Sequence, residues 1–188
     1  MPHLRVIGGT KKGARLRTPS GLGTRPLLGR IKEALFSILD PIIGSCEFLD
    51  LFAGSGSVGI EALSRGAAAC NFVEQDAACV RIIKENLRTL ELHNQSNVMR
   101  AHVQSALRRL DKAACQFGLI FIGPPYGQNL AHQTLIQLAR LRVVAPEGIV
   151  IAQIGRRETL DKSYGELHLF RAKTYGDTTL RFYRRHHS

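Results

Sequence analysis

Three glycines, Gly54, Gly56 and Gly59, form a candidate cofactor loop directly after an apolar stretch of the sequence. The spacing Gly-x-Gly-x-x-Gly between a strand and a helix makes a tight turn in which a ligand can approach the backbone closely. Asp50 lies four residues before Gly54, where a carboxylate can face a cationic ligand. Glu74 follows Gly54 by 20 residues, the separation typical of an acid that binds a ribose diol. The pattern therefore predicts a cofactor that contains a nucleoside.

Positions 123–127 form a second candidate loop with the sequence Gly-Pro-Pro-Tyr-Gly, and this loop follows the apolar stretch 117–122. In an open α/β sheet, ligands bind at the carboxyl ends of the strands, so we expect this loop to face the cofactor loop. The two prolines before Tyr126 and the glycine after it favour a rigid, exposed turn. An aromatic ring presented there can stack on a nucleobase that is drawn out of its helix.

Alternating strand and helix patterns position these two loops. Near-continuous apolar stretches separated by helical ones predict a parallel sheet that is covered on both faces. Two strands at 166–173 and 178–184, joined by a hairpin turn, predict an antiparallel strand at the end of the sheet. Asp40 and Pro41 are expected to end the first helix. The other strands are expected at 46–52, 69–74, 98–103, 117–122 and 148–154, and the helices at 30–39, 56–64, 76–90, 106–110 and 130–141.

The charge of the chain is strongly positive and unevenly distributed. Its 188 residues include 26 Lys and Arg against 15 Asp and Glu, which gives a formal net charge of +11. Such a cation attracts polyanions, so nucleic acid is the favoured partner, and a merely solvated basic surface is the alternative. Residues 1–32 contain no acid, and the alternation at 4–7 and 15–17 predicts a β-hairpin. The sequence therefore divides into a basic N-terminal β-hairpin extension, 1–28, and a main domain, 29–188.

Composition argues against several other classes of protein. The four cysteines are scattered, without a Cys-x-x-Cys pair or a histidine at ligand spacing, so we expect no metal site. No stretch approaches the roughly 20 apolar residues of a membrane span. The first residues also lack the apolar core of a signal peptide. These features favour a cytoplasmic protein without a membrane partner, and a monomer is the default expectation.

Beyond these local patterns, the sequence resembles the bacterial 16S rRNA (guanine-N2)-methyltransferases, the RsmD-like family of class I S-adenosylmethionine-dependent enzymes. Its Pro-Pro-Tyr loop is similar to the Asp-Pro-Pro-Tyr or Asn-Pro-Pro-Tyr loop of methyltransferases that modify exocyclic amino groups of bases. A dinucleotide oxidoreductase with the same glycine spacing is disfavoured, because it gives no role to this loop or to the basic N-terminal segment. The other matching stretches occur in family order over nearly the whole chain, at 5–9, 23–26, 30–36, 49–56, 61–67 and 175–178.

The resemblance implies a Rossmann-like class I methyltransferase fold, with a seven-stranded, mostly parallel sheet and an antiparallel C-terminal strand. It implies methyl transfer from S-adenosylmethionine to the exocyclic N2 of a guanine in 16S rRNA, either free or in a small-subunit assembly particle. In the family, the loop acid and a proline carbonyl accept the two N–H bonds of the amine, which directs its lone pair at the methyl group. The catalytic candidates are Gly123, Pro124, Pro125 and Tyr126, the cofactor-binding candidates are Asp50, Phe52, Ala53, Gly54, Ser55, Gly56, Glu74, Gln75, Ser105 and Ala106, and the RNA-binding candidates are Arg5, Lys11, Lys12, Arg15, Arg17, Arg25 and Arg30.

This sequence departs from the family pattern around the reaction centre. Gly123 stands at the acid position of the second loop and offers no side-chain acceptor, and Gln153 stands where a Glu is common. The stretches 27–29 and 103–106 also differ from the usual Thr-Ser-Asp and Gly-Asp-Ala. Two hypotheses remain open. In the first, a backbone carbonyl of Gly123 or Pro124 and a water replace the acid in an active enzyme. In the second, a weakened or inactive homologue binds S-adenosylmethionine and rRNA as a ribosome-assembly factor.

Overall fold

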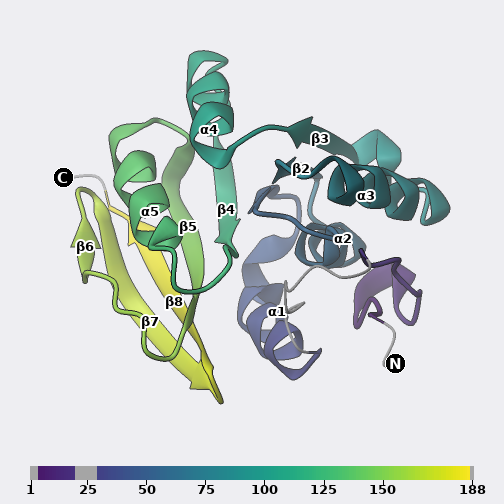
Figure 1. Cartoon of the computed structure of the whole chain (residues 1–188), viewed down its shortest axis with the longest axis horizontal. Helices are drawn as coiled ribbons and strands as arrows, with labels where there is room; N and C mark the ends of the chain where they lie inside the picture. Colours follow the sequence, from purple (N-terminus) through teal and green to yellow (C-terminus); the bar gives the residue numbers. More distant parts are fainter. Residues whose placement is uncertain (1–3, 20–28, 187–188) are drawn as a thin grey trace.

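A computed structural model describes residues 4–19 and 29–186, and an eight-stranded sheet forms its centre (Figure 1). The strand order is β3-β2-β1-β4-β5-β8-β7-β6, and β1 to β5 run parallel to one another. β8 pairs antiparallel with both β5 and β7, and β6 pairs antiparallel with β7. The strands are β1 (Glu47–Leu51), β2 (Ala69–Glu74), β3 (Ser96–Arg100), β4 (Phe117–Ile122), β5 (Val144–Gly155), β6 (Ser163–Tyr164), β7 (Leu167–Tyr175) and β8 (Thr178–Arg185).

Helices cover both faces of the sheet, with α1, α2 and α3 on one face and α4 and α5 on the other. Phe48 of β1 belongs to the first core and its neighbour Leu49 to the second, because successive side chains of a strand point to opposite faces. Within 4–19 and 29–186, no helix has the combined length and apolar character to cross a bilayer. The helices are α1 (Gly29–Ile43), α2 (Ser57–Ser64), α3 (Ala77–Thr89), α4 (Val103–Lys112) and α5 (Leu130–Arg140), with short 3-10 turns η1 (Gly9–Lys11) and η2 (His93–Gln95).

The α/β, Rossmann-like arrangement expected from the sequence is confirmed, although several elements differ in detail. β3 covers Ser96–Arg100 rather than 98–103, and β5 begins at Val144 rather than at 148. The sheet has eight strands rather than seven, because the two-residue β6 adds to its edge. α1 does not end at Asp40 and Pro41 but continues to Ile43, whose buried side chain extends the apolar stripe of Leu39. Val103, expected at the end of a strand, begins α4 instead, and its side chain is buried in the core on that face of the sheet.

The basic segment 4–19 lies against α2. A single antiparallel bridge joins Arg5 to Arg15, and η1 forms the turn between them, where the sequence predicted a hairpin of two strands. Val6 and Leu16 are buried and belong to the core that includes α1 and α2. The division at residue 28 falls outside the described residues, so the two-part organisation stays a prediction.

A buried ion pair attaches this segment to the helices beneath it. The ammonium nitrogen of Lys32 lies 3.1 Å from the carboxylate of Glu61, and both side chains are 0% exposed. The Lys32 ammonium also donates to the carbonyl of Arg5 at 2.8 Å and to the hydroxyl of Ser57 at 3.0 Å. Burial lowers the pKa of Lys32, and the charge and hydrogen bond of Glu61 oppose that change. One side chain of α1 therefore binds the N-terminal segment and the start of α2 together.

The Glu61 carboxylate is saturated with donors. Its oxygens accept the backbone N–H groups of Ile7 at 2.8 Å and Gly8 at 2.7 Å. Nε of Arg65 donates to it at 2.9 Å, and the guanidinium of Arg65 also reaches Asp40 on α1 at 2.9 Å. A buried ion pair offsets its desolvation cost only when such additional hydrogen bonds are present. The network thus fixes the N-terminal segment in one position on α2.

Replacement of Lys32 by Met is expected to destabilise the fold strongly, because it removes one of the two cations that neutralise the buried carboxylate of Glu61. The free energy of unfolding should fall by about 3–5 kcal/mol, as for other buried pairs that lose one partner. Urea unfolding followed by circular dichroism measures this change. Lys112→Met, at an exposed lysine of α4, is the matched control and should change stability by less than about 0.5 kcal/mol. Equal stability of the two variants would contradict the assigned role of the pair.

Candidate functional site

The cofactor loop connects β1 to α2 through three residues in the left-handed region of backbone space. The φ angles of Phe52, Gly54 and Gly56 are 63°, 58° and 77°. The N–H of Ala53 donates to the carbonyl of Val73 on β2 at 3.0 Å, and the N–H of Gly56 donates to the carbonyl of Ala53 at 2.8 Å. A Cβ atom added at Gly54 would meet no other atom within 4 Å. The turn is therefore fixed by its own hydrogen bonds and leaves open space in front of its backbone.

Gly59 serves the packing of α2. A Cβ atom at this position would overlap the ring of Phe72 and would lie 2.6 Å from the sulfur of Cys70. Both of these side chains belong to β2. The third glycine of the motif thus allows the helix to lie close on the sheet, which is its usual role in such loops.

Asp50 lies inside the protein, against the start of α2. Its side chain is 1% exposed, and one carboxylate oxygen accepts the N–H of Gly59 at 2.9 Å. Burial raises the pKa of Asp50 to about 7, against the effect of the Gly59 hydrogen bond, and the nearby Glu74 carboxylate adds to the rise. The sequence suggested that this carboxylate faces a cationic ligand. In the structure its contact is with α2, so its visible role is to hold the helix that follows the loop.

Glu74 ends β2 beside the cofactor loop. Its two carboxylate oxygens accept the N–H of Gly54 at 2.8 Å and the N–H of Asp76 at 2.9 Å. Because each carboxylate oxygen can accept more than one hydrogen bond, Glu74 can orient the loop and still bind hydroxyl groups. Gln75 next to it is exposed, and Ser55 in the loop is half-buried.

The two remaining cofactor candidates lie in the first turn of α4. Ser105 is half-buried and Ala106 is 0% exposed. The backbone N–H groups of both residues donate to the carbonyl of His102 at 3.0 Å. A ligand at this position could therefore use the Ser105 hydroxyl or apolar surface, but not these two N–H groups.

The second loop lies beside the first because β4 is the neighbour of β1 in the sheet. Leu51 pairs with Ile122 at the ends of these strands, and the N–H of Gly123 donates to the carbonyl of Leu51 at 3.2 Å. Pro124 is buried and Pro125 is exposed. The structure thus brings together the two loops that sequence spacing singled out, at the carboxyl edge of the parallel strands.

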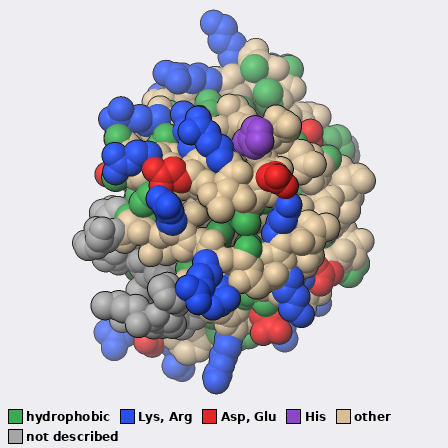
Figure 2. Space-filling view, turned by 90° about the vertical axis from the view of Figure 1, so that its right-hand side faces the viewer, with side chains coloured by type: hydrophobic (Ala, Val, Ile, Leu, Met, Phe, Trp, Pro, Cys, Tyr) green, Lys and Arg blue, Asp and Glu red, His purple; other side chains and the backbone are tan. Residues whose placement is uncertain are grey.

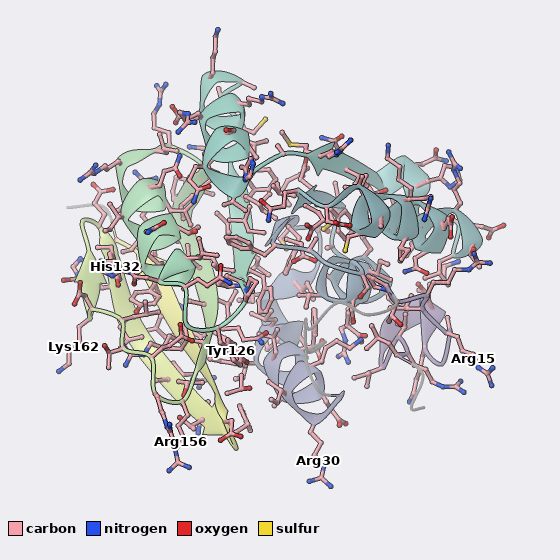
Figure 3. All side chains as sticks on the ribbon, viewed as in Figure 1. Arg15, Arg30, Tyr126, His132, Arg156 and Lys162 are labelled. Carbon is pink, nitrogen blue, oxygen red and sulfur yellow. The ribbon has the colours of Figure 1, made fainter. Side chains whose placement is uncertain are left out.

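Tyr126 projects from this loop and is anchored at the far end of its ring (Figure 3). Its hydroxyl lies 2.9 Å from the hydroxyl of Thr178, at the start of β8, and accepts a hydrogen bond from the amide of Gln153 at 2.9 Å. The side chain is still 36% exposed. Gln153, which departs from the family pattern, therefore has a definite task here, since it holds the aromatic ring in one orientation.

Glu158 connects the same loop to the end of β5, and no sequence pattern pointed to this residue. One of its carboxylate oxygens accepts the N–H of Gly127 at 3.0 Å, and the other accepts the N–H of Gly155 at 2.6 Å. Glu158 and Gly127 are 31 residues apart, so no local spacing rule connects them. Only the adjacency of β4 and β5 makes this contact possible.

At the acid position of the loop, a neighbouring ring occupies the space that a side chain would need. A Cβ atom at Gly123 would lie 2.7 Å from Cε1 of Phe121, which is buried. Within 123–127 the one side-chain oxygen is the hydroxyl of Tyr126, so the other acceptors are backbone carbonyls. Across the described ranges, no three His, Cys, Asp or Glu side chains are arranged to hold a metal ion.

Basic side chains are spread over the face formed by α3 and the N-terminal segment. Figure 2 looks onto the face of α3 and the N-terminal segment, where Lys and Arg are spread widely among fewer acidic groups. Figure 3 places Arg15 at the right-hand side, on the N-terminal segment, and Arg30 at the lower end of α1. Arg25 lies outside the described residues. The exposed RNA-binding candidates are Arg5, Lys12, Arg15, Arg17 and Arg30.

Two of the basic candidates are engaged with acids of α3 and the turn after it. The guanidinium of Arg17 lies 3.0 Å from Glu85, and the ammonium of Lys11 lies 4.0 Å from Glu91. Lys11 is half-buried. The N-terminal segment therefore has fewer unpaired basic side chains among its described residues than its sequence alone suggests.

Comparison with known proteins gives a consistent assignment. The family model described as conserved hypothetical protein 95 matches residues 4–184. The chain is 32% identical over 183 residues to ribosomal RNA small subunit methyltransferase D of Escherichia coli K12, covering 97% of this chain and 90% of that protein. It is 35% identical over 184 residues to the protein of the same name from Haemophilus influenzae, covering 96% and 93%. The solved structure of yhhF from Escherichia coli is similar with a TM-score of 0.85 and 31% identity, over 98% of this chain and 99% of that chain.

The raised pKa of Asp50 predicts a pH dependence of stability that Asp50→Asn should remove. The folded state holds the proton more tightly than the unfolded state, whose carboxyl titrates near pH 4. Stability from this group is therefore complete below about pH 4 and is lost as the pH rises towards about 7, with a slope of at most about 1.4 kcal/mol per pH unit. Free energies of unfolding at a series of pH values, for both proteins, test this. Parallel curves between pH 4 and 7 would contradict the prediction.

Proposed function

The chain belongs to the conserved hypothetical protein 95 family, and on that premise we propose that it transfers a methyl group from S-adenosylmethionine to the exocyclic N2 of a guanine in small-subunit (16S) rRNA. Relatives named ribosomal RNA small subunit methyltransferase D support ribosomal RNA methylation as the reaction class. The observation that carries the proposal is the hydrogen bond from Gly123 to Leu51, since it sets the Pro-Pro-Tyr loop beside the cofactor loop.

The residues around the cofactor loop fit S-adenosylmethionine. The space in front of Gly54 admits a ligand against the backbone, and the carboxylate of Glu74 beside it suits the hydroxyl groups of a ribose. When bound there, the cofactor supplies a methyl group on a cationic sulfur. Asp50 acts from behind the loop, because it holds the start of α2. The other residues proposed to line this site are Phe52, Ala53, Ser55, Gly56, Gln75, Ser105 and Ala106.

Residues 123–126 are proposed to hold the target base. The carbonyl of Gly123 or Pro124 accepts an N–H of the exocyclic amine and so directs its lone pair towards the methyl group. The ring of Tyr126 stacks on the base. The hydrogen bonds of the Tyr126 hydroxyl with Gln153 and Thr178 support this role, because they fix the ring before a base arrives. The remaining N–H of the amine binds water in place of the absent acid.

A second function is favoured by one specific observation. Gly123 offers no side-chain acceptor, and the ring of Phe121 fills the adjacent space. A protein with this loop could bind cofactor and rRNA and yet transfer methyl groups slowly, which would suit a ribosome-assembly factor. Loss of one preorganised polar contact typically costs about 100- to 1000-fold in rate.

A single-turnover assay with labelled S-adenosylmethionine and unmethylated small-subunit particles distinguishes these functions. We expect transfer by the wild type and a faster rate in Gly123→Asp, because the new carboxylate supplies the second acceptor. Gly123→Ala is the matched control, since it adds the same Cβ next to Phe121 without the acid. The rate of Gly123→Asp should exceed that of Gly123→Ala by about 100-fold.

A wild type that transfers nothing, together with an active Gly123→Asp variant, would overturn the proposed activity in favour of the assembly factor. Methyl transfer to a nitrogen other than N2 of guanine, identified by nuclease digestion and mass spectrometry, would overturn the proposed specificity. Failure to bind S-adenosylmethionine by calorimetry would contradict both functions.

The basic N-terminal segment and α1 are proposed to bind RNA phosphates, and a triple variant tests this. Lys12, Arg15 and Arg30 are exposed, and substitution of all three by Ala should weaken RNA binding and lower its salt dependence. The matched control removes the same charge from the other face, at Arg109, Lys112 and Arg140. Fluorescence anisotropy at several salt concentrations measures both. If the two triple variants bind RNA equally, the assignment is wrong.

A further inference from the structure

A second basic surface, which the proposed function does not use, lies on β7 and β8. We define the β7–β8 surface as Phe170, Arg171, Lys173 and Arg184. Residues 170 to 174 of β7 are all exposed, and Phe170 is 45% exposed, one of the largest apolar exposures among the described residues. Figure 1 shows β7 at one side of the sheet, away from α1, α2 and α3.

Strand register puts these side chains on one face. Lys173 pairs with Leu180, and Arg171 pairs with Phe182, so both basic residues share the face of that apolar pair. Arg184 lies two residues beyond Phe182 and therefore points to the same face. The register shifts between Leu169 and Arg171, which places Phe170 in an irregularity of the strand. Bulges of this kind commonly re-aim a side chain.

Phe170 and Arg184 form a preassembled pair. The guanidinium carbon of Arg184 lies 4.8 Å from the centre of the Phe170 ring, and this ring packs against Phe182 at a centroid distance of 6.2 Å. Cation–π contacts of this geometry are attractive. The aromatic ring and the cation are thus held together before any partner binds.

All of the charged side chains of this surface are positive. Neither β7 nor β8 contains an Asp or Glu. Among the ion pairs of the described residues, none involves Arg171, Lys173 or Arg184, whereas Arg185 is paired with Glu166 at 2.9 Å. Three cations therefore flank an exposed ring without internal neutralisation. A polyanion with flat, apolar faces, namely single-stranded nucleic acid, matches this combination.

The surface is also connected to the candidate catalytic loop. From Phe170, β7 continues to its last residue, Tyr175, which pairs with Thr178. The hydroxyl of Thr178 is hydrogen-bonded to that of Tyr126. Five residues of extended chain span about 17 Å. A strand of RNA with its target base at Tyr126 could therefore reach Phe170 with nucleotides close to the target.

We propose that the β7–β8 surface binds an unpaired stretch of the RNA substrate next to the target base, with a base stacked on Phe170 beside Arg184 and phosphates on Arg171 and Lys173. The identity of this RNA as a substrate rests on the proposed function. The binding itself does not, because it depends only on the ring and the cations of this surface. Stacking on an aromatic ring tolerates any base, so this surface contributes affinity rather than sequence selection.

Binding of a fluorescent, unstructured RNA of about 12 nucleotides, measured by anisotropy, tests the proposal. Phe170→Ala should weaken binding about tenfold, and Phe170→Leu, which keeps apolar contact with Phe182 but not the aromatic face, should also weaken it. Arg184→Gln should weaken binding and reduce the salt slope by about one. Ile42→Ala, at a 44% exposed residue of α1, and Arg140→Gln on α5 are the matched controls and should bind as the wild type does.

Thermal unfolding of each variant shows that binding is compared between folded proteins, and Phe170→Leu replaces Phe170→Ala if the latter does not fold. Unchanged RNA affinity in both Phe170→Leu and Arg184→Gln would overturn the proposal, and would favour an acidic protein as the partner of this surface. Photocrosslinking of an RNA that carries 4-thiouridine should yield an adduct on the peptide containing Phe170. If the variants lose RNA affinity but the wild type transfers no methyl group, the proposed surface is supported and the proposed enzyme activity is refuted. If the variants transfer methyl groups and bind RNA with normal affinity, the enzyme activity is supported and the proposed surface is refuted.

Discussion

The salt bridge between Lys32 and Glu61 is the interaction on which the arrangement of this protein depends. Two charges are removed from water completely, and such a pair is stable only because every other polar atom around it is also matched. The matching groups come from distant parts of the sequence. Backbone amides of the N-terminal segment and a lysine of α1 meet at one carboxylate of α2. Since α2 also receives the cofactor loop, the position of that loop depends on the same network.

Much of the fold could be predicted from the sequence, and the reason is physical. β2 and β4 have the predicted bounds, because strands buried on both faces leave long apolar stretches with clear ends. The predicted helix ends were less accurate where burial overrides a local signal. α1 continues past Pro41, because the side chain of Ile43 is then buried in the core. The burial of Lys32 could not be predicted, since nothing in the local sequence marks a lysine as buried.

In the candidate site, too, some features could be predicted from the sequence and others could not. Glycine spacing and the Pro-Pro-Tyr motif identified both loops, because each is a continuous segment with strict backbone requirements. The residues that hold those loops in place could not be found in this way. Glu158, Gln153 and Thr178 reach the second loop from two other strands and their connections, so their contacts exist only after the sheet has formed. Asp50 was recognised as important, but its direction, towards α2, depends on the packing of Gly59.

The position of β8 also has a consequence for the order in which the protein can be completed. This strand is the last of the sheet in sequence, yet it lies between β5 and β7. During vectorial synthesis, earlier strands can assemble while the chain emerges, but β7 has no bond to the parallel sheet until β8 is inserted. Thr178 begins that strand, so Tyr126 acquires its final anchor only at this late step. A nascent chain would thus complete the loop between β1 and α2 well before the loop at Tyr126 has all of its anchors.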